Sequence, residues 1–165
     1  MTDHLPSAGF CCRDHSGKAR AEAILAEAEA RVQANGLRLT PVRRRTLEIL
    51  LEAHGALGAY EVLERLGNEG FGTQPPVAYR ALNFLVENGL AHRIRRLNAF
   101  TACVHPAREH RAAFLICDRC ESVTEANAEA LAQAMADAAA REGFSLERST
   151  IEAVGLCRNC AGQAT

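Results

Sequence analysis

Four of the seven cysteines in this 165-residue chain form two C-x-x-C pairs, Cys117 with Cys120 and Cys157 with Cys160. Two residues between the thiols let the backbone fold around one ion, so each pair can hold a metal through both sulfurs. Two pairs complete the tetrahedral four-thiolate shell of a structural zinc site. The 36 residues between Cys120 and Cys157 exceed the usual zinc-ribbon spacing. A helix and a strand within that gap would bring the second pair back beside the first.

Redox chemistry of the thioredoxin type is the alternative interpretation of a C-x-x-C pair. It requires a single pair at the start of a helix in a larger βαβ domain, and two pairs in so short a segment fit structural zinc better. Cys11, Cys12 and His15 could also touch a metal, but they stand in an N-terminal stretch without periodicity. We expect that stretch to be a mobile tail.

A second set of candidate ligands is His92, Cys103, His110 and Glu125. Each of them alone is ordinary, but their places along the chain are informative. His92 follows the fourth predicted helix, Cys103 closes a predicted hairpin, His110 lies in a linker and Glu125 starts the last long helix. A metal held by these four would join the two halves of the chain. His105 competes for one of the ligand positions.

Helix start and stop signals divide the first half of the chain into four helices. Thr40-Pro41 and Pro75-Pro76 are start signals, whereas Asn35-Gly36 and Asn88-Gly89 are stop signals. The predicted helices span residues 19–35, 41–53, 60–66 and 76–88. A hairpin follows over residues 90–96 and 99–104. Helix, turn, helix and hairpin is the order of a winged helix-turn-helix, with Arg93, Arg95 and Arg96 of the wing expected to meet phosphates.

The second half has the pattern of a small α/β unit. Short strands are predicted at residues 114–117 and 122–124, followed by an alanine-rich helix from Glu125 to Arg141 and an alternating segment at residues 144–154. A unit of this size buries little core by itself, so we expect it to dimerise, to be stabilised by a metal, or both.

Charge and composition narrow the function classes. The chain is 48% hydrophobic and 24% charged, which is typical of a globular protein. Residues 36–98 carry nine arginines against six glutamates, whereas residues 101–165 carry six arginines against nine acidic residues. A basic first half beside an acidic second half indicates two tasks. No apolar run reaches the roughly 20 residues of a membrane span, and the first residues do not form a signal peptide, so we expect a cytoplasmic protein.

Five segments resemble the ferric uptake regulator superfamily, and within it the branch of zinc regulators. They are Arg-Leu-Thr-Pro-Val-Arg (38–43), Gly-Ala-Tyr-Glu-Val-Leu (58–63), Pro-Pro-Val-Ala-Tyr-Arg-Ala-Leu-Asn-Phe-Leu (75–85), Phe-Leu-Ile-Cys-Asp-Arg-Cys (114–120) and Ile-Glu-Ala-Val-Gly-Leu-Cys-Arg-Asn-Cys (151–160). The resemblance covers about residues 20 to 160. It implies a dimeric, metal-dependent repressor that binds inverted-repeat operator DNA and controls zinc homeostasis.

The resemblance also implies roles for individual residues. It assigns the four C-x-x-C cysteines to structural zinc, and it assigns His92, Cys103, His110 and Glu125 to regulatory zinc, so that each chain would hold two zinc ions. Tyr60 and Arg80 fall on DNA-contacting positions, and we expect neighbouring Tyr79 to contact DNA as well. Val77 departs from the family pattern, which usually has threonine there, and so removes a hydroxyl that would contact phosphate.

The sequence therefore predicts an α+β protein without enzymatic activity or a small-molecule substrate. We expect a flexible tail (1–18), a winged-helix DNA-binding domain (19–104), a hinge (105–111) and a dimerisation and zinc-binding domain (112–165). An iron or peroxide sensor of the same superfamily is the alternative, and the thiolate of Cys103 favours zinc over it. A zinc enzyme would need an open coordination position, and an interaction module would not need the basic helix.

Overall fold

The computed structural model describes residues 15–53, 55–106, 112–146 and 149–162. The helices are α1 (His15–Ala34), α2 (Pro41–Glu52), α3 (Ala59–Asn68), α4 (Pro75–Glu87), α5 (Glu129–Arg141) and α6 (Arg158–Ala161). The strands are β1 (Leu57–Gly58), β2 (Ala91–Ile94), β3 (Ala99–Ala102), β4 (Ala112–Cys117), β5 (Val123–Asn127) and β6 (Ile151–Gly155). The expected α+β fold is confirmed. None of the helices in the described part of the chain could span a membrane.

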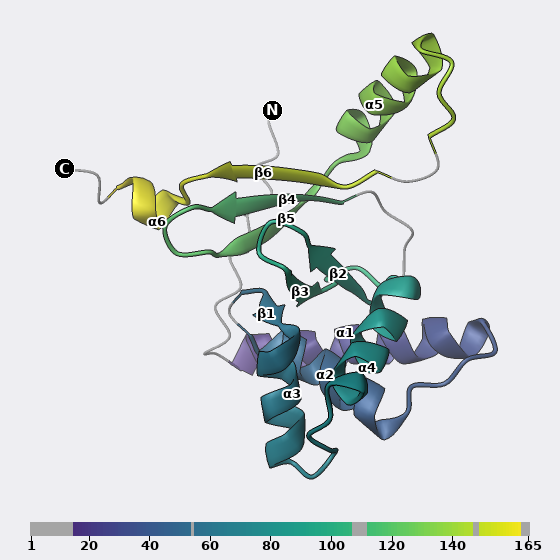
Figure 1. The fold of residues 1–165 in the computed structure, drawn as a ribbon, viewed down its shortest axis with the longest axis vertical. Helices are drawn as coiled ribbons and strands as arrows, with labels where there is room; N and C mark the ends of the chain where they lie inside the picture. Colours follow the sequence, from purple (N-terminus) through teal and green to yellow (C-terminus); the bar gives the residue numbers. More distant parts are fainter. Residues whose placement is uncertain (1–14, 54, 107–111, 147–148, 163–165) are drawn as a thin grey trace.

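Helices α1 to α4 pack around one apolar core (Figure 1). Their inward faces carry aliphatic side chains at helical spacing, of which Leu47, Val62, Leu66, Leu82 and Leu85 are fully buried. Burying each such side chain contributes about 1.5–3 kcal/mol. Proline stands in the first turn of both α2 and α4, as the start signals predicted. Helix α1 begins at His15, so residues 15–18 are helical and not part of a tail as expected.

The wing is a three-stranded sheet in the order β1-β3-β2. The predicted hairpin forms with Ala91 opposite Ala102 and Ile94 opposite Ala99, and its turn includes Asn98 at φ 47°. Asparagine tolerates this left-handed conformation, which explains why the turn falls there. Strand β1 was not predicted, because two residues carry too little pattern to be detected.

The second half is a three-stranded sheet in the order β5-β4-β6, with α5 between β5 and β6 in the chain. The expectation that Glu125 starts a helix is wrong, because Glu125 lies in β5 opposite Phe114 of β4. Helix α5 begins four residues later, where the Asn127 side-chain oxygen accepts a hydrogen bond from the Glu129 N–H at 2.9 Å. The segment expected at residues 144–154 forms a shorter strand, Ile151–Gly155.

The wing packs against the second sheet, which lies above it in Figure 1. Ile94 of β2 forms a small buried cluster with Phe114 and Ile116 of β4. The two halves of the chain therefore share an apolar contact in addition to their covalent connection.

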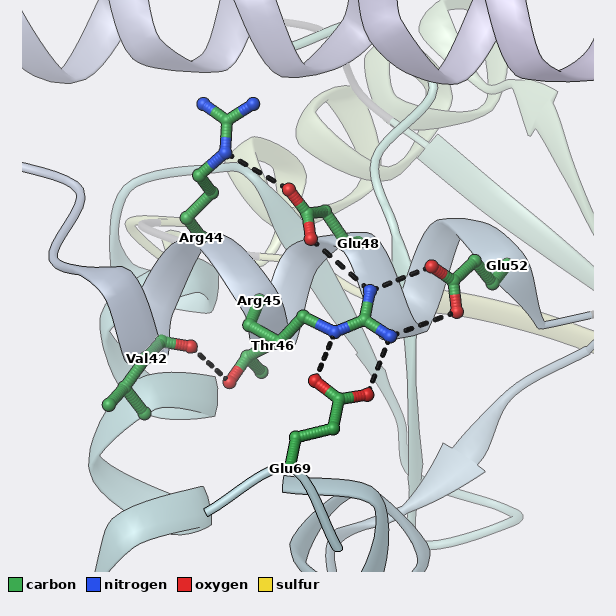
Figure 2. A network of polar contacts seen from close by, with 7 residues as sticks. All are labelled: Val42, Arg44, Arg45, Thr46, Glu48, Glu52 and Glu69. Carbon is green, nitrogen blue, oxygen red and sulfur yellow. Dashed lines mark hydrogen bonds and ion pairs between the residues drawn. The ribbon is translucent and has the colours of Figure 1, made fainter. Parts of the chain in front are cut away.

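A charged network fixes α2 against the end of α3 (Figure 2). The Arg45 guanidinium donates to Glu48 and Glu52 on its own helix and, at 2.5 and 2.7 Å, to both carboxylate oxygens of Glu69. The side chain of Arg45 is 23% exposed. These contacts hold α2 against the C-terminal end of α3.

Candidate metal centres and nucleic-acid interface

The four C-x-x-C cysteines meet at the end of the second sheet. Cys117 ends β4 and Cys120 follows in the next turn, whereas Cys157 precedes α6 and Cys160 lies within it. All four sulfur atoms lie within 4.8 Å of one another, and Cys120 Sγ is 3.8 Å from Cys157 Sγ. A tetrahedron with Zn–S bonds of about 2.3 Å has edges of about 3.8 Å. The donor set and its spacing fit a zinc ion.

The thiols of this cluster differ in acidity. Backbone N–H groups, first that of Cys157 at 3.4 Å, lower the pKa of Cys117 to about 6. The neighbouring Cys157 side chain, together with burial, raises the pKa of Cys160 to about 12. One thiolate forms readily, and its charge then opposes the next one. A divalent cation would relieve that repulsion by replacing the protons.

A second cluster lies where the wing meets the second sheet. His92 comes from β2, Cys103 directly follows β3, and Glu125 comes from β5. Their ligand atoms lie within 4.8 Å of one another, and His92 Nε2 is 3.7 Å from Glu125 Oε2. That separation is too long for a hydrogen bond but suits two ligands of one ion. Zinc in proteins is bound by thiolate sulfur, imidazole nitrogen and carboxylate oxygen, and this cluster offers one of each.

Burial dominates the chemistry of Cys103. The side chain is completely buried, and this burial raises the pKa of the thiol to about 12. A hydrogen bond from the backbone N–H of His105 acts in the opposite direction. A metal at this cluster must therefore displace a proton from Cys103.

The other predicted ligands fall outside the two clusters of described residues. The fourth residue expected at the second site, His110, lies outside the part of the chain that the structure describes, as do Cys11 and Cys12. His105 has an exposed side chain and is not a member of the second cluster. His105 contributes to the second cluster through its backbone N–H, which donates to the Cys103 sulfur.

Helix α4 presents a polar face that the core does not use. Ala78, Ala81, Leu82, Phe84 and Leu85 are its buried side, whereas Tyr79 and Arg80 are exposed. Tyr60, at the start of α3, is 68% exposed. Val77 packs against the apolar core, so a side chain without a hydroxyl has a packing role at this position.

The turn of the wing is solvent-exposed but is bonded through its backbone to the second sheet. The backbone N–H groups of Arg95 and Arg96 donate to the two carboxylate oxygens of Glu152 on β6, at 2.7 and 3.0 Å. The Arg96 guanidinium lies 3.3 Å from Asp118. This exposed ion pair does not test the expectation that the wing arginines contact phosphates, which stays a prediction.

Sequence reasoning also missed Arg31. Its guanidinium, on α1, donates a hydrogen bond to the carbonyl oxygen of Pro106 at 2.8 Å. Pro106 is three residues after Cys103 in the chain. The two residues are 75 positions apart, and no local pattern in either segment signals the contact.

The fold and the clusters define a winged-helix protein with a cysteine-clustered α/β domain. The chain belongs to the ferric uptake regulator family, whose model matches residues 34–154. This confirms the resemblance inferred from the motifs. The chain is 38% identical over 144 residues to the zinc uptake regulation protein of Escherichia coli (strain K12), with 87% of this chain and 84% of that protein covered.

Solved structures support the same relationship. A zinc uptake regulator complexed with zinc and DNA matches at 37% identity with a TM-score of 0.82, covering 86% of this chain and 95% of that one. Holo XcZur matches at 37% identity with a TM-score of 0.78, over 85% and 98% of the two chains. The apo form of XcZur reaches only 0.50 at the same identity, over 87% and 99%. The arrangement described above is thus more similar to the holo form.

Proposed function

We propose that this chain is a zinc-responsive transcriptional repressor of zinc uptake and homeostasis genes. The observation that carries the proposal is the second cluster, where His92 and Cys103 from the DNA-binding half meet Glu125 from the other half. Similarity to a zinc uptake regulator that was solved with zinc and DNA supports both the metal and the nucleic acid. Its target is operator DNA in the cytoplasm.

Each chain would hold two zinc ions with different tasks. Cys117, Cys120, Cys157 and Cys160 would hold a structural ion, whose binding energy is folding energy for the second half. His92, Cys103 and Glu125, with His110 as the proposed fourth ligand, would hold the regulatory ion. Bound zinc would join the ligands of each site through coordination bonds. Cys103 favours zinc over iron, because a thiolate is a soft ligand.

The regulatory ligands act by fixing the orientation of the wing. When His92, Cys103 and Glu125 are held together, the wing is fixed on the second sheet, and α4 is fixed with it. Without that constraint only a fraction of chains has the competent arrangement, and the apparent DNA affinity falls by that fraction. The domain division at residues 104 and 112, with a hinge between, is part of this proposal.

DNA reading is assigned to α4, with Arg80 as the base reader and with Tyr79 and Tyr60 as further contacts. Exposure of all three side chains supports the assignment. The repressor acts as a homodimer, and its operators are inverted repeats, because operator symmetry mirrors the two-fold symmetry of a dimer.

Zinc content per chain tests the metal assignment. The purified protein is expected to carry one zinc that survives mild chelation and a second that is removed. Cys120→Ser removes one ligand of the four-cysteine site, so we expect that variant to lose the retained zinc and much of its folded structure. A Cys120→Ser protein that keeps its retained zinc and stable fold contradicts the assignment.

A further inference from the structure

We propose that Glu152 is a positioning residue that sets the zinc concentration at which the second cluster fills. This inference rests on the proposed function and adds a residue that is not a ligand. Glu152 lies on β6, and its carboxylate accepts the backbone N–H groups of Arg95 and Arg96 at 2.7 and 3.0 Å. A charged acceptor with two donors is a strong tether for a turn.

The register of the second sheet places this tether in line with the cluster. Phe114 of β4 is paired with Glu125 on one side and with Glu152 on the other. Paired residues on neighbouring strands project to the same face of a sheet. The His92 ring lies 5.0 Å from the Phe114 ring, so this face is the one that the wing covers.

The wing is therefore held at both edges of the sheet. Glu125 on β5 faces His92 at one end of β2, and Glu152 on β6 holds the turn at the other end. The backbones of Glu125 and Glu152 lie two strand spacings apart, about 10 Å, and about three residues of β2 have the same length. Strand β2 thus crosses the three strands, with Ile94 and Phe114 packed between the two polar ends.

This geometry gives Glu152 a specific effect. The ligands His92 and Cys103 move with the wing, whereas Glu125 stays with the sheet. In the absence of metal, the Glu152 tether keeps the wing packed against the second sheet and thereby preorganises the three ligands. Without the tether, part of the zinc binding energy is needed to bring the wing onto the second sheet. Zinc affinity is therefore lower, whereas the arrangement of the zinc-saturated protein is unchanged.

The test uses the full chain with its four-cysteine site loaded, and it compares the parent with Glu152→Gln and Glu152→Ala. Glu142→Gln, which neutralises an exposed carboxylate at the end of α5, is the control. Competition with a zinc chelator measures affinity at the second cluster. We expect Glu152→Ala to lose about ten-fold, the change that 1.4 kcal/mol produces, with Glu152→Gln between it and the parent. The control should equal the parent.

Two further measurements separate positioning from mere stability. In zinc-saturated protein, the amides of Arg95 and Arg96 should exchange with solvent faster in Glu152→Ala than in the parent. Affinity for an inverted-repeat operator at saturating zinc should stay within about three-fold of the parent. Unchanged zinc affinity in Glu152→Ala, or loss of the four-cysteine zinc with it, overturns the inference. A parent that takes up no second zinc contradicts the proposed function instead.

Discussion

If the second cluster holds zinc as proposed, the buried thiol of Cys103 should make that binding depend on pH. Its pKa, raised to about 12 by burial, keeps the sulfur protonated at neutral pH, whereas a zinc ligand must be a thiolate. Each unit of rising pH lowers the cost of removing that proton. Between roughly pH 7 and 9, zinc affinity should therefore rise about ten-fold per pH unit through Cys103 alone.

Calorimetry in two buffers with different ionisation enthalpies counts the released proton directly. We expect about one proton from Cys103 for each zinc bound at the second cluster at about pH 8. Zinc binding there without proton release would mean that Cys103 is already a thiolate or is not a ligand.

At the scale of single residues, the sequence predicted which side chains lie close together but was less accurate about the strands and helices that carry them. Glu125 was assigned to a helix because alanines follow it, yet pairing with Phe114 of β4 makes it part of a strand. Asn127 was the available signal, since its side-chain oxygen accepts a hydrogen bond from the N–H of Glu129, the first residue of α5. The contact of Glu152 with Arg95 has no local signature, because 57 positions separate the two residues.

Helix α4 is the element to which DNA specificity is assigned, and Arg80 tests that assignment. Its exposed guanidinium can form a bidentate contact with a guanine edge. Arg80→Ala should weaken specific binding by about 1–3 kcal/mol and relax the preference at one base position. Binding to a library of operator variants measures both effects. Equal weakening for every sequence would make Arg80 a phosphate contact.

The Arg45 network tests how α2 and α3 are held together. Arg45→Ala leaves three glutamates near one another, so we expect the free energy of unfolding to fall by about 1–2 kcal/mol, more than one exposed ion pair contributes. Arg38→Ala, an exposed arginine before α2, is the control. Urea denaturation of both variants measures the difference, and equal stability of the two would show that the network is not stabilising.

The same network predicts how the stability of the fold changes with pH. Arg45 lowers the pKa of Glu69 in the folded chain, so this pair stabilises the fold at pH values above the ordinary pKa of a glutamate. The contribution is lost as pH falls through the lowered pKa. The difference in stability between the parent and Arg45→Ala should accordingly shrink in acid.

At the scale of elements, patterns with many residues were predicted well. The four helices of the first half and the hairpin were expected within a few residues of their observed bounds, because buried aliphatic side chains and proline or glycine signals agree. Strand β1 and helix α6 were missed, since two to four residues carry no period. Their positions depend on pairing with β3 and on the Cys157–Cys160 turn.

The whole molecule leaves apolar side chains on the outside of its second half. Leu131 and Met135 of α5 are 54% and 48% exposed, and Figure 1 shows α5 projecting away from the sheet. A second copy would bury this surface. Leu131→Glu should therefore shift the protein towards monomer, whereas Ala130→Glu, with the same added charge on an exposed neighbour, should not. Sedimentation velocity measures the shift, and an unchanged dimer would place the interface elsewhere.

Zinc at the junction between the two halves is proposed to control DNA binding. The most direct test of this control is the affinity for an inverted-repeat operator, selected from a random library. That affinity is measured as a function of free zinc for the parent and for Cys103→Ser. We expect the parent to gain affinity steeply as its second zinc binds. Cys103→Ser should stay folded, keep the four-cysteine zinc and fail to bind operator at the same zinc levels. Equal zinc-dependent binding by both proteins would show that zinc at this junction does not control DNA binding.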